Sequence, residues 1–262
     1  MIEDASPLSQ LLDDSSLDEF EAALLVAEVL SDGVDKARAR TEVAGLAQDF
    51  GAGAERSGEA LCQFMASQGF VGAVDDYYGL ANSCVDQVLQ RHSGIPITLA
   101  VIYLKVASIL GMEGSGINYP GHFLVEVAGQ LIDPFRGATT DRSACEQPLR
   151  EAGYTGSLDE AFRSTSVRDV ALRMLNNARG VLDAAGRWSD ALELLDHQQL
   201  LAPDEVELCF ERARLWAGAG SLDMAREVLE TARAQFSDPR TLSAIDERLT
   251  SFPASNSGPV LN

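Results

Sequence analysis

The sequence predicts an α+β domain followed by an all-α helical block, and three patterns support this fold class. Apolar residues recur at helical spacing through much of the first hundred residues. Short apolar or alternating segments between Gly116 and Phe135, bounded by turn residues, indicate strands. After Val167 the chain contains only helical patterns, and these repeat themselves. We therefore expect a first domain over residues 17–165 and a helical domain over residues 166–250.

The first strongly periodic segment begins at Leu17, after an acidic stretch, residues 1–16, that we expect to be flexible. Its apolar positions predict an amphipathic helix that ends near Gly33 (Phe20, Leu24, Leu25, Val29, Leu30). Similar spacing predicts helices over 36–50 and 59–68, and "FVGAVDDYYGL" is typical of a loop. "NSCVDQVLQR" then starts another helix, with Asn82 or Ser83 as its N-cap.

The stretch "SGIP" ends that helix and begins the next, with Pro96 in the first turn, where a missing N–H costs least. The helix that follows is apolar on several sides, which indicates a position at the centre of a core. Its apolar run from Ile97 to Leu110 is interrupted by Lys105 and is shorter than a membrane span requires. We therefore expect a buried helix at this point.

Three short strands are expected next, in "GINY", "HFLVEV" and "QLIDPF", with "AGQ" as a tight connection between the last two. The segment "GATTDRSACEQPLREAGYTGS" is polar and rich in turn residues. It predicts a loop with one short helix at the boundary between the two domains.

The helical block repeats with a period of 34 residues. Matched positions keep the same character in both copies (Leu175/Cys209, Leu182/Trp216, Gly186/Gly220, Trp188/Leu222, Ala191/Ala225, Leu195/Leu229). Pro203 closes the first copy, Asp238-Pro239 follows the second, and 240–249 is expected to cap the stack. This period is typical of tetratricopeptide (TPR) helix pairs. Two copies are fewer than the three usually needed for stability, so the block should depend on the first domain, and residues 251–262 are expected to be a flexible tail.

Charge and composition exclude several classes of function. Twenty basic and forty acidic residues give a formal net charge of −20, which opposes binding to nucleic-acid backbones and anionic membranes and favours a basic protein or peptide partner. The N-terminus lacks the basic and apolar regions of a signal peptide. The four cysteines form no CxxC pair, and the three histidines are far apart, so we expect free thiols, no metal, no cofactor and a cytoplasmic location.

His122 on one expected strand and Asp133 at the end of the next make two thirds of a nucleophile–His–Asp site. An acyl-transfer site of this kind needs a thiol at a helix N-terminus, where the dipole lowers its pKa. The start of the buried helix offers that place two residues after Gly94, but the residue there is Pro96, which has no nucleophile. Cys84 is the alternative nucleophile, although its apolar neighbours favour core packing.

Five motifs make the chain resemble the SirB-type family, often labelled regulators of sirC expression, in which a transglutaminase-like domain is joined to TPR helices ("DDYYGLANS", "RHSGIPITLAVIYL", "YPGHFLVEV", "DPFRG", "LRMLNNARGVL"). The resemblance runs from about Phe20 to Pro239. It implies a cysteine-protease-like α+β core in which active enzymes carry cysteine at the position of Pro96, with histidine and aspartate at His122 and Asp133. The family itself has this "GIP" form, so the resemblance implies a fold and not an activity.

The resulting prediction is a non-catalytic interaction or regulatory protein with a degenerate transglutaminase-like site. The alternative is a cysteine-dependent amide hydrolase or acyl transferase that uses Cys84 with His122 and Asp133. A third reading, a direct DNA-binding regulator, conflicts with the acidic charge.

Several residues also have a purely structural interpretation. His122 can be a structural imidazole, and Asp133 can start an Asp-Pro turn by bonding its own backbone. Arg91 and Arg136 can hold carboxylates or cover the site. The paired amides Asn176-Asn177, unusual inside a helix, can bond a peptide backbone or pin the two domains together.

Overall fold

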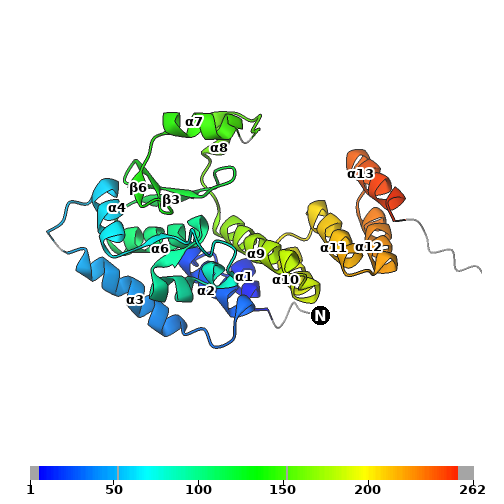
Figure 1. Cartoon of the computed structure of the whole chain (residues 1–262), viewed down its shortest axis with the longest axis horizontal. Helices are drawn as coiled ribbons and strands as arrows, with labels where there is room; N and C mark the ends of the chain where they lie inside the picture. The colour runs from blue at the N-terminus through cyan, green and yellow to red at the C-terminus, as the bar shows by residue number, and fades with distance from the viewer. Residues whose placement is uncertain (1–5, 52, 152, 253–262) are drawn as a thin grey trace, which may run out of the picture. The chain divides into compact units, whose positions relative to one another are not determined.

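The computed structural model describes residues 6–51, 53–151 and 153–252. Its residues fall into two compact units. Figure 1 shows the chain coloured by residue number. We call Ala5–Ala178 the N-terminal unit and the residues from Arg179 onward the C-terminal unit. The boundary falls inside one helix, α9 (Val167–Ala184).

The N-terminal unit is a helical segment that leads into a small antiparallel sheet. Its helices are η1 (Pro7–Ser9), α1 (Gln10–Asp13), α2 (Glu19–Leu30), α3 (Lys36–Asp49), α4 (Gly58–Ser67), η2 (Leu80–Ser83), α5 (Val85–Arg91), α6 (Pro96–Ile109), α7 (Arg142–Glu151), α8 (Leu158–Ala161) and the first part of α9. Its strands are β1 (Val71–Gly72), β2 (Ser93–Gly94), β3 (Gly114–Ile117), β4 (Leu124–Val127), β5 (Gln130–Asp133) and β6 (Ala138–Thr139). The predicted α+β fold class is confirmed.

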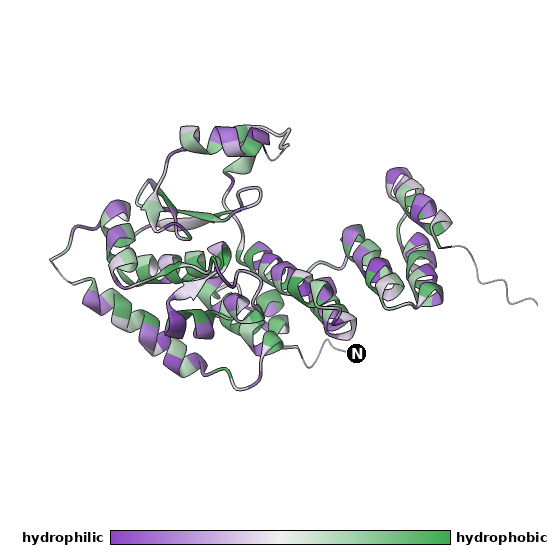
Figure 2. Cartoon of the chain, viewed as in Figure 1, coloured by the Kyte–Doolittle hydropathy of each residue, from purple (hydrophilic) through white to green (hydrophobic). Residues whose placement is uncertain are grey.

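Helix α6 is the centre of this unit. Most of its residues are buried, and Figure 2 shows it apolar along its length. It packs against strands β3 and β4 and against helices α2 and α3, so that it lies between the sheet and the N-terminal helices (Figure 1). Pro96 occupies its first turn and is itself buried. The predicted buried central helix is therefore confirmed.

The sheet has the order β3-β4-β5-β6 and is antiparallel throughout. Strands β4 and β5 are joined by the two residues Ala128 and Gly129, both with positive φ (49° and 76°), which matches the right-handed twist of the strands. The three predicted strands and their tight connection are confirmed. Strand β6 and the parallel pair β1–β2 were not predicted, because two-residue strands are too short to show alternation.

Two local predictions differ from the structure. Residues 6–13 form short helical turns, and Leu8 is fully buried, so this part of the expected flexible stretch packs on the core; residues 1–5 lie outside the described residues. Neither Asn82 nor Ser83 caps α5. Both lie in η2, Cys84 takes the N-cap position without a side-chain bond, and the Asn82 amide has partners elsewhere.

The polar segment after β6 contains more helix than expected. Helices α7 and α8 cover one side of the sheet through a buried cluster that includes Tyr119, Leu149 and Phe162. Ser164 then bridges to Ile117, and the Thr165 N–H donates to the Gly116 carbonyl at 2.9 Å. The sheet edge thus extends to the predicted boundary, and the compact unit continues to residue 178, because α9 runs on without a break.

The C-terminal unit is entirely helical over its described residues, as expected. It contains the end of α9 and then α10 (Trp188–Leu201), α11 (Val206–Gly218), α12 (Leu222–Gln235) and α13 (Pro239–Thr250). The matched glycines Gly186 and Gly220 both have positive φ, 70° and 81°, and end α9 and α11 in the same way. Helices α11, α12 and α13 share one buried cluster. The TPR assignment stays a prediction, and residues 253–262 of the expected tail lie outside the described residues.

Candidate functional site

The structure brings His122 and Asp133 into direct contact. The Nε2 atom of His122 lies 2.8 Å from Oδ1 of Asp133. The imidazole side chain is 24% exposed, whereas the carboxylate is 8% exposed. Among the described residues, Nδ1 of His122 has no hydrogen-bond partner. A histidine held by a carboxylate at one nitrogen, with the other nitrogen open, is the arrangement that acyl-transfer sites use.

The sheet positions this pair through a turn and a strand register. The His122 N–H donates to the Tyr119 carbonyl at 2.9 Å, in a turn where Gly121 takes a φ of 74°. His122 therefore lies two residues before β4, and Asp133 ends the neighbouring β5. Because Val125 pairs with Ile132, the ends of these strands place the two side chains side by side.

Asp133 has both of the roles that the sequence left open. Its Oδ1 accepts from His122 and from the backbone N–H groups of Phe135 and Arg136, at 3.0 and 3.1 Å. Burial alone would raise the pKa of this carboxyl group. The hydrogen bond and charge of His122 and the contacts of Arg136 outweigh burial and hold the pKa of Asp133 below its ordinary value. Asp133 is thus an ionised acceptor that fixes both the turn and the imidazole.

Aromatic side chains lie beside the pair. The Phe135 ring is 6.1 Å from the His122 ring in an edge-to-face arrangement and 5.8 Å from the Tyr77 ring, and Tyr77 contacts Tyr78 at 5.2 Å. Gly72 allows this packing, because a Cβ atom there would lie 2.5 Å from the Phe135 ring. Tyr77 is 39% and Tyr78 78% exposed, so the group reaches the surface.

The loop that carries these tyrosines is held by Asn82. Its amide nitrogen donates to the Asp76 carbonyl, and its amide oxygen accepts from Arg91 at 3.1 Å. The Thr98 hydroxyl, in the first turn of α6, donates to the Asn82 carbonyl at 2.8 Å. The motifs "DDYYGLANS" and "RHSGIPITLA" are therefore joined by direct hydrogen bonds. Arg91 serves this loop and holds no carboxylate among the described residues.

Arg173 of α9 also belongs to the site, although the sequence did not single it out. Its Nη2 donates to the His122 carbonyl at 2.7 Å, and its guanidinium lies 5.5 Å from the centre of the Phe123 ring. Burial lowers the pKa of Arg173 below its ordinary value, and the nearby Tyr77 opposes that shift. The motif "LRMLNNARGVL" contains this residue, but nothing in its spacing indicates a contact 51 positions away.

The structure does not bring Cys84 to His122. No hydrogen bond or other contact joins the two within the described residues, and the Cys84 thiol instead points to the Leu80 carbonyl at 3.9 Å. Burial, together with the charge of Asp86, raises the pKa of Cys84 to about 12. Such a thiol is protonated at neutral pH and is a poor nucleophile.

Another thiol lies nearer to the pair. Burial and the charge of Asp133 raise the pKa of Cys62 to about 11. Burial also raises the pKa of Tyr103, and Cys62 and Asp133 add smaller effects in the same direction. Tyr103 is fully buried, and its hydroxyl has no hydrogen-bond partner in the described part of the chain. No pattern in the sequence indicates either residue, because both look like ordinary core positions of α4 and α6.

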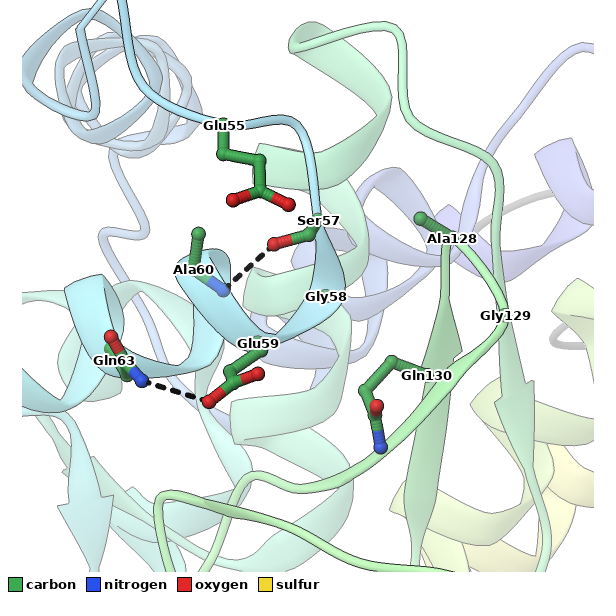
Figure 3. A pocket seen from close by; sticks show the side chains of 9 residues that line it. All are labelled: Glu55, Ser57, Gly58, Glu59, Ala60, Gln63, Ala128, Gly129 and Gln130. Carbon is green, nitrogen blue, oxygen red and sulfur yellow. Dashed lines mark hydrogen bonds between the residues drawn. The ribbon is translucent and has the colours of Figure 1, made fainter.

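A surface hollow of about 450 Å³ lies at the start of α4, away from the residues described above (Figure 3). Its lining includes Glu55, Glu59 and Gln130, and the Ser57 hydroxyl caps the helix by accepting from the Ala60 N–H at 3.2 Å. Gly58 fits here because a Cβ atom would lie 2.5 Å from the Val127 carbonyl oxygen. Its two carboxylates give the hollow an acidic wall.

The remaining predicted residues have the following places. Arg136 is 80% exposed with its Nε 3.5 Å from Oδ2 of Asp133, while Asn176 is exposed and Asn177 half-buried on α9. Over the described ranges, no three His, Cys, Asp or Glu side chains are grouped to hold a metal ion. Within the same residues, no helix has the length and hydrophobicity needed to cross a membrane.

Comparisons with known proteins agree with this fold. A sequence model of the transglutaminase-like superfamily matches residues 25–176, which contain α6, the sheet and the His122–Asp133 pair. A UPF0162 protein of Pseudomonas aeruginosa is 30% identical over 244 residues, covering 88% of this chain and 89% of its own. A UPF0162 protein of Xylella fastidiosa is 32% identical over 171 residues, and F-box only protein 21 of Mus musculus is 29% identical over 167 residues.

The coverage of these matches is uneven. The match to the Xylella fastidiosa protein covers 62% of this chain and 61% of that protein. The match to F-box only protein 21 covers 58% of this chain but 26% of that protein. No solved structure matches the chain. Of these three relatives, the Pseudomonas aeruginosa protein is similar over most of both sequences.

Proposed function

We propose that this chain, which belongs to the transglutaminase-like superfamily, is a non-catalytic interaction protein with a degenerate acyl-transfer site. The observation that supports this most is the start of α6, where buried Pro96 stands at the position that the family resemblance gives to the nucleophile. His122 and Asp133 keep their contact at 2.8 Å without a thiol bonded to the imidazole in the described residues. The pair then serves binding and architecture.

The pattern of relatives supports a binding module. A region similar to 58% of this chain makes up 26% of F-box only protein 21, so a region of this kind also occurs as one part of a longer chain. The SirB-type assignment and a role in regulating expression, through a protein partner rather than DNA, are part of the proposal. A reducing compartment such as the cytoplasm suits a chain with four free, buried cysteines.

The second candidate is a cysteine-dependent amide hydrolase or acyl transferase. The intact His122–Asp133 contact favours it, because an oriented imidazole with one open nitrogen is ready to act as a base. It requires a thiol that is deprotonated near neutral pH and placed beside His122. Cys84 would have to leave its present contact with the Leu80 carbonyl to become that thiol.

Thiol reactivity separates the two candidates. In the non-catalytic protein, all four cysteines of the full chain should react with iodoacetamide at neutral pH no faster than a free peptide cysteine, as peptide mapping by mass spectrometry would measure. A single cysteine that alkylates much faster, and slows again in His122→Ala, would overturn the proposal. If that cysteine were Cys84, the enzyme candidate would take its place.

We further propose that the C-terminal unit provides the partner-binding surface. Residues 179–252 carry fourteen acidic and eight basic side chains, and Leu222 and Met224 are exposed on α12 (50% and 40%). This combination suits a basic segment with apolar residues, whose binding weakens as salt rises.

Two double variants of the full chain test where a captured partner binds. Leu222→Ser with Met224→Ser should reduce capture, whereas Val71→Ser with Val74→Ser should leave it unchanged. The second pair is the control, because Val71 and Val74 are also exposed apolar residues but belong to the N-terminal unit (51% and 74%). Loss of capture with the valine pair alone would move the surface to the N-terminal unit.

A further inference from the structure

Arg173 is a cation held beside His122 by contacts that leave its charge uncompensated. Its Nη2 donates to the His122 carbonyl at 2.7 Å, and the guanidinium packs over the Phe123 ring at 5.5 Å. A carbonyl and an aromatic ring fix the position of the group but do not neutralise it. Arg173 is thus oriented in advance, at the same backbone segment that carries the imidazole.

No ion pair in the described residues involves Arg173. By contrast, Arg38 and Arg142 of the same unit lie 2.7 and 3.4 Å from Glu42 and Asp159. The Nε and Nη1 atoms of Arg173 donate to no acceptor in the described part of the chain, and neither atom is sealed from solvent. A half-buried guanidinium with open N–H groups is well suited to bind an anion, because burial strengthens charge-assisted hydrogen bonds.

The nearby carboxylates do not pair with Arg173. Asp133 is engaged elsewhere: Arg136 lies 3.5 Å from its Oδ2, and its Oδ1 accepts from three donors. Asp75 and Asp76, in the loop before Tyr77, form no ion pair with Arg173 in the described residues. The charge of Arg173 is therefore open to a ligand.

An apolar surface adjoins the cation. Tyr77 is 39% exposed, and its ring lies 5.8 Å from the half-buried Phe135 ring. Tyr77 is also close enough to Arg173 for each to affect the pKa of the other, after the larger effect of burial on both. A ligand that binds the guanidinium therefore has an exposed aromatic ring close by.

We propose that Arg173, His122, Tyr77 and Phe135 form a binding site for a peptide carboxylate that is flanked by an apolar side chain. The planar guanidinium matches a carboxylate, the open Nδ1 of His122 accepts from a peptide N–H of the same ligand, and the rings take the apolar side chain. The inference rests on the proposed function, since it treats the His122–Asp133 pair as part of a binding site. The carboxylate comes from a chain terminus or from an Asp or Glu side chain, and the experiment separates these sources.

The test uses the full ¹⁵N-labelled chain and three small probes in NMR titrations. N-acetylphenylalanine carries a free α-carboxylate, N-acetylphenylalaninamide carries none, and N-acetyl-Phe-Glu-amide carries only a side-chain carboxylate. At least one of the two acids should shift the resonances of His122 and the Arg173 side chain. The amide should bind roughly tenfold more weakly or worse, because a hydrogen bond to a charged group is lost. The tighter of the two acids identifies the source.

Arg173→Gln tests the residue itself. It keeps a donor for the His122 carbonyl but removes the charge, so the acid should bind about as weakly as the amide. Arg173→Lys should restore part of the binding. Arg56→Gln is the matched control, because Arg56 also donates to a backbone carbonyl, that of Leu110 at 3.3 Å, and also packs over a phenylalanine ring, Phe50 at 5.8 Å. This control should leave the affinity unchanged.

Two results would overturn the inference. One is that the acids and the amide bind with equal affinity, or that neither acid binds at roughly 10 mM, a concentration well above a Kd of about 1 mM. The other is unchanged binding in Arg173→Gln. Either result leaves the non-catalytic proposal intact, because that proposal fails only on thiol reactivity.

Discussion

The two units of the molecule arrange their polar groups differently. In the N-terminal unit, buried or half-buried hydrogen bonds connect segments far apart in the sequence, such as Thr98 to Asn82 and Arg173 to His122. In the C-terminal unit, many of the charged contacts are exposed ion pairs, such as Arg187–Asp190 and Arg233–Asp246, in which all four side chains are at least 44% exposed. Exposed pairs contribute little to stability, whereas a buried donor without its partner is costly.

This difference indicates that the two units are suited to different kinds of binding. The N-terminal unit fixes individual side chains around one imidazole, while the C-terminal unit repeats a helical pair that presents charge to solvent. A binding site of defined geometry is therefore expected in the first and a broad electrostatic surface in the second.

The largest expected effect concerns independent folding. Residues 167–262 contain two helix pairs and α13, fewer than the three repeats usually needed, and should be largely unfolded or aggregated when expressed alone. Circular dichroism during heating should show no sharp transition for this fragment. The full chain, by comparison, should unfold in one step. A fragment with native helicity and a sharp transition would show that the C-terminal unit folds without the first.

The next effect compares equally buried leucines of the two units. Leu99 of α6 and Leu229 of α12 are both fully buried, and Leu→Ala at such positions costs about 2–5 kcal/mol of unfolding free energy. Leu99→Ala should lie higher in this range, because α6 is packed from both sides and has less room to relax. Urea unfolding measures both values.

The exposed residue Leu222, 50% accessible, provides the control for these variants. Leu222→Ala should change the unfolding free energy by at most about 0.5 kcal/mol. A larger loss for Leu229→Ala than for Leu99→Ala would contradict the view that α6 is the less adaptable core.

The sequence predicted the regular parts of both units and missed the contacts that make the site. Helical period and turn residues are local signals, so α2, α6 and the β4–β5 hairpin are predicted close to their observed bounds, and the repeat predicts a helical block after Val167. The motif order also predicts His122 and Asp133 on neighbouring strands; Asp133 ends β5, whereas His122 lies two residues before β4. The N-cap role given to Asn82 was wrong, because its amide bonds a loop carbonyl six residues earlier.

Arg173, Tyr77 and Cys62 were missed for a related reason. Their neighbours come from other elements, and no period along the chain encodes a contact between α9 and the residue before β4. The domain boundary at residues 165/166 stays a prediction. The change from strand to helix pattern marks the end of the sheet, whereas the first compact unit continues to Ala178, inside α9.

A smaller effect is expected for Asp133 as a function of pH. Its folded-state pKa is lowered from 3.8, so its contribution to stability is present above that value and is lost as the pH falls through the folded-state pKa. Asp133→Asn should therefore cost about 1–3 kcal/mol at neutral pH, and the gap from the unsubstituted chain should close in acid. Urea unfolding at pH values from neutral to about 2 measures the difference in unfolding free energy between the two chains. The ordinary pKa of aspartate is the reference for where this difference should begin to close.

Glu126→Gln is the matched control for this measurement. Glu126 lies on β4, and its side chain forms no hydrogen bond or ion pair among the described residues, so its substitution should leave the pH profile unchanged. A gap for Asp133→Asn that stays constant from neutral pH into acid would mean that the ionised carboxylate does not hold His122.

The smallest expected effect is a change in one thiol pKa, and it returns to the comparison of the two units. Pro96 and Pro239 both stand in the first turn of a helix, α6 in the N-terminal unit and α13 in the C-terminal unit. A cysteine at either position experiences the helix dipole, but only position 96 is expected to face an imidazole held by a carboxylate. Pro96→Cys should therefore acquire a thiol pKa about one to two units below the ordinary value, equivalent to about 1.4–2.7 kcal/mol. Pro239→Cys should not, because Asp238 beside it disfavours a thiolate.

The pH dependence of iodoacetamide labelling, read at each new cysteine by peptide mapping, gives both values. Adding His122→Ala should return the thiol at position 96 toward the ordinary pKa and leave that at position 239 unchanged. Equal values at the two positions would mean that His122 and Asp133 now serve only the architecture of the sheet, and that the start of α6 is no longer a place where the fold can activate a nucleophile.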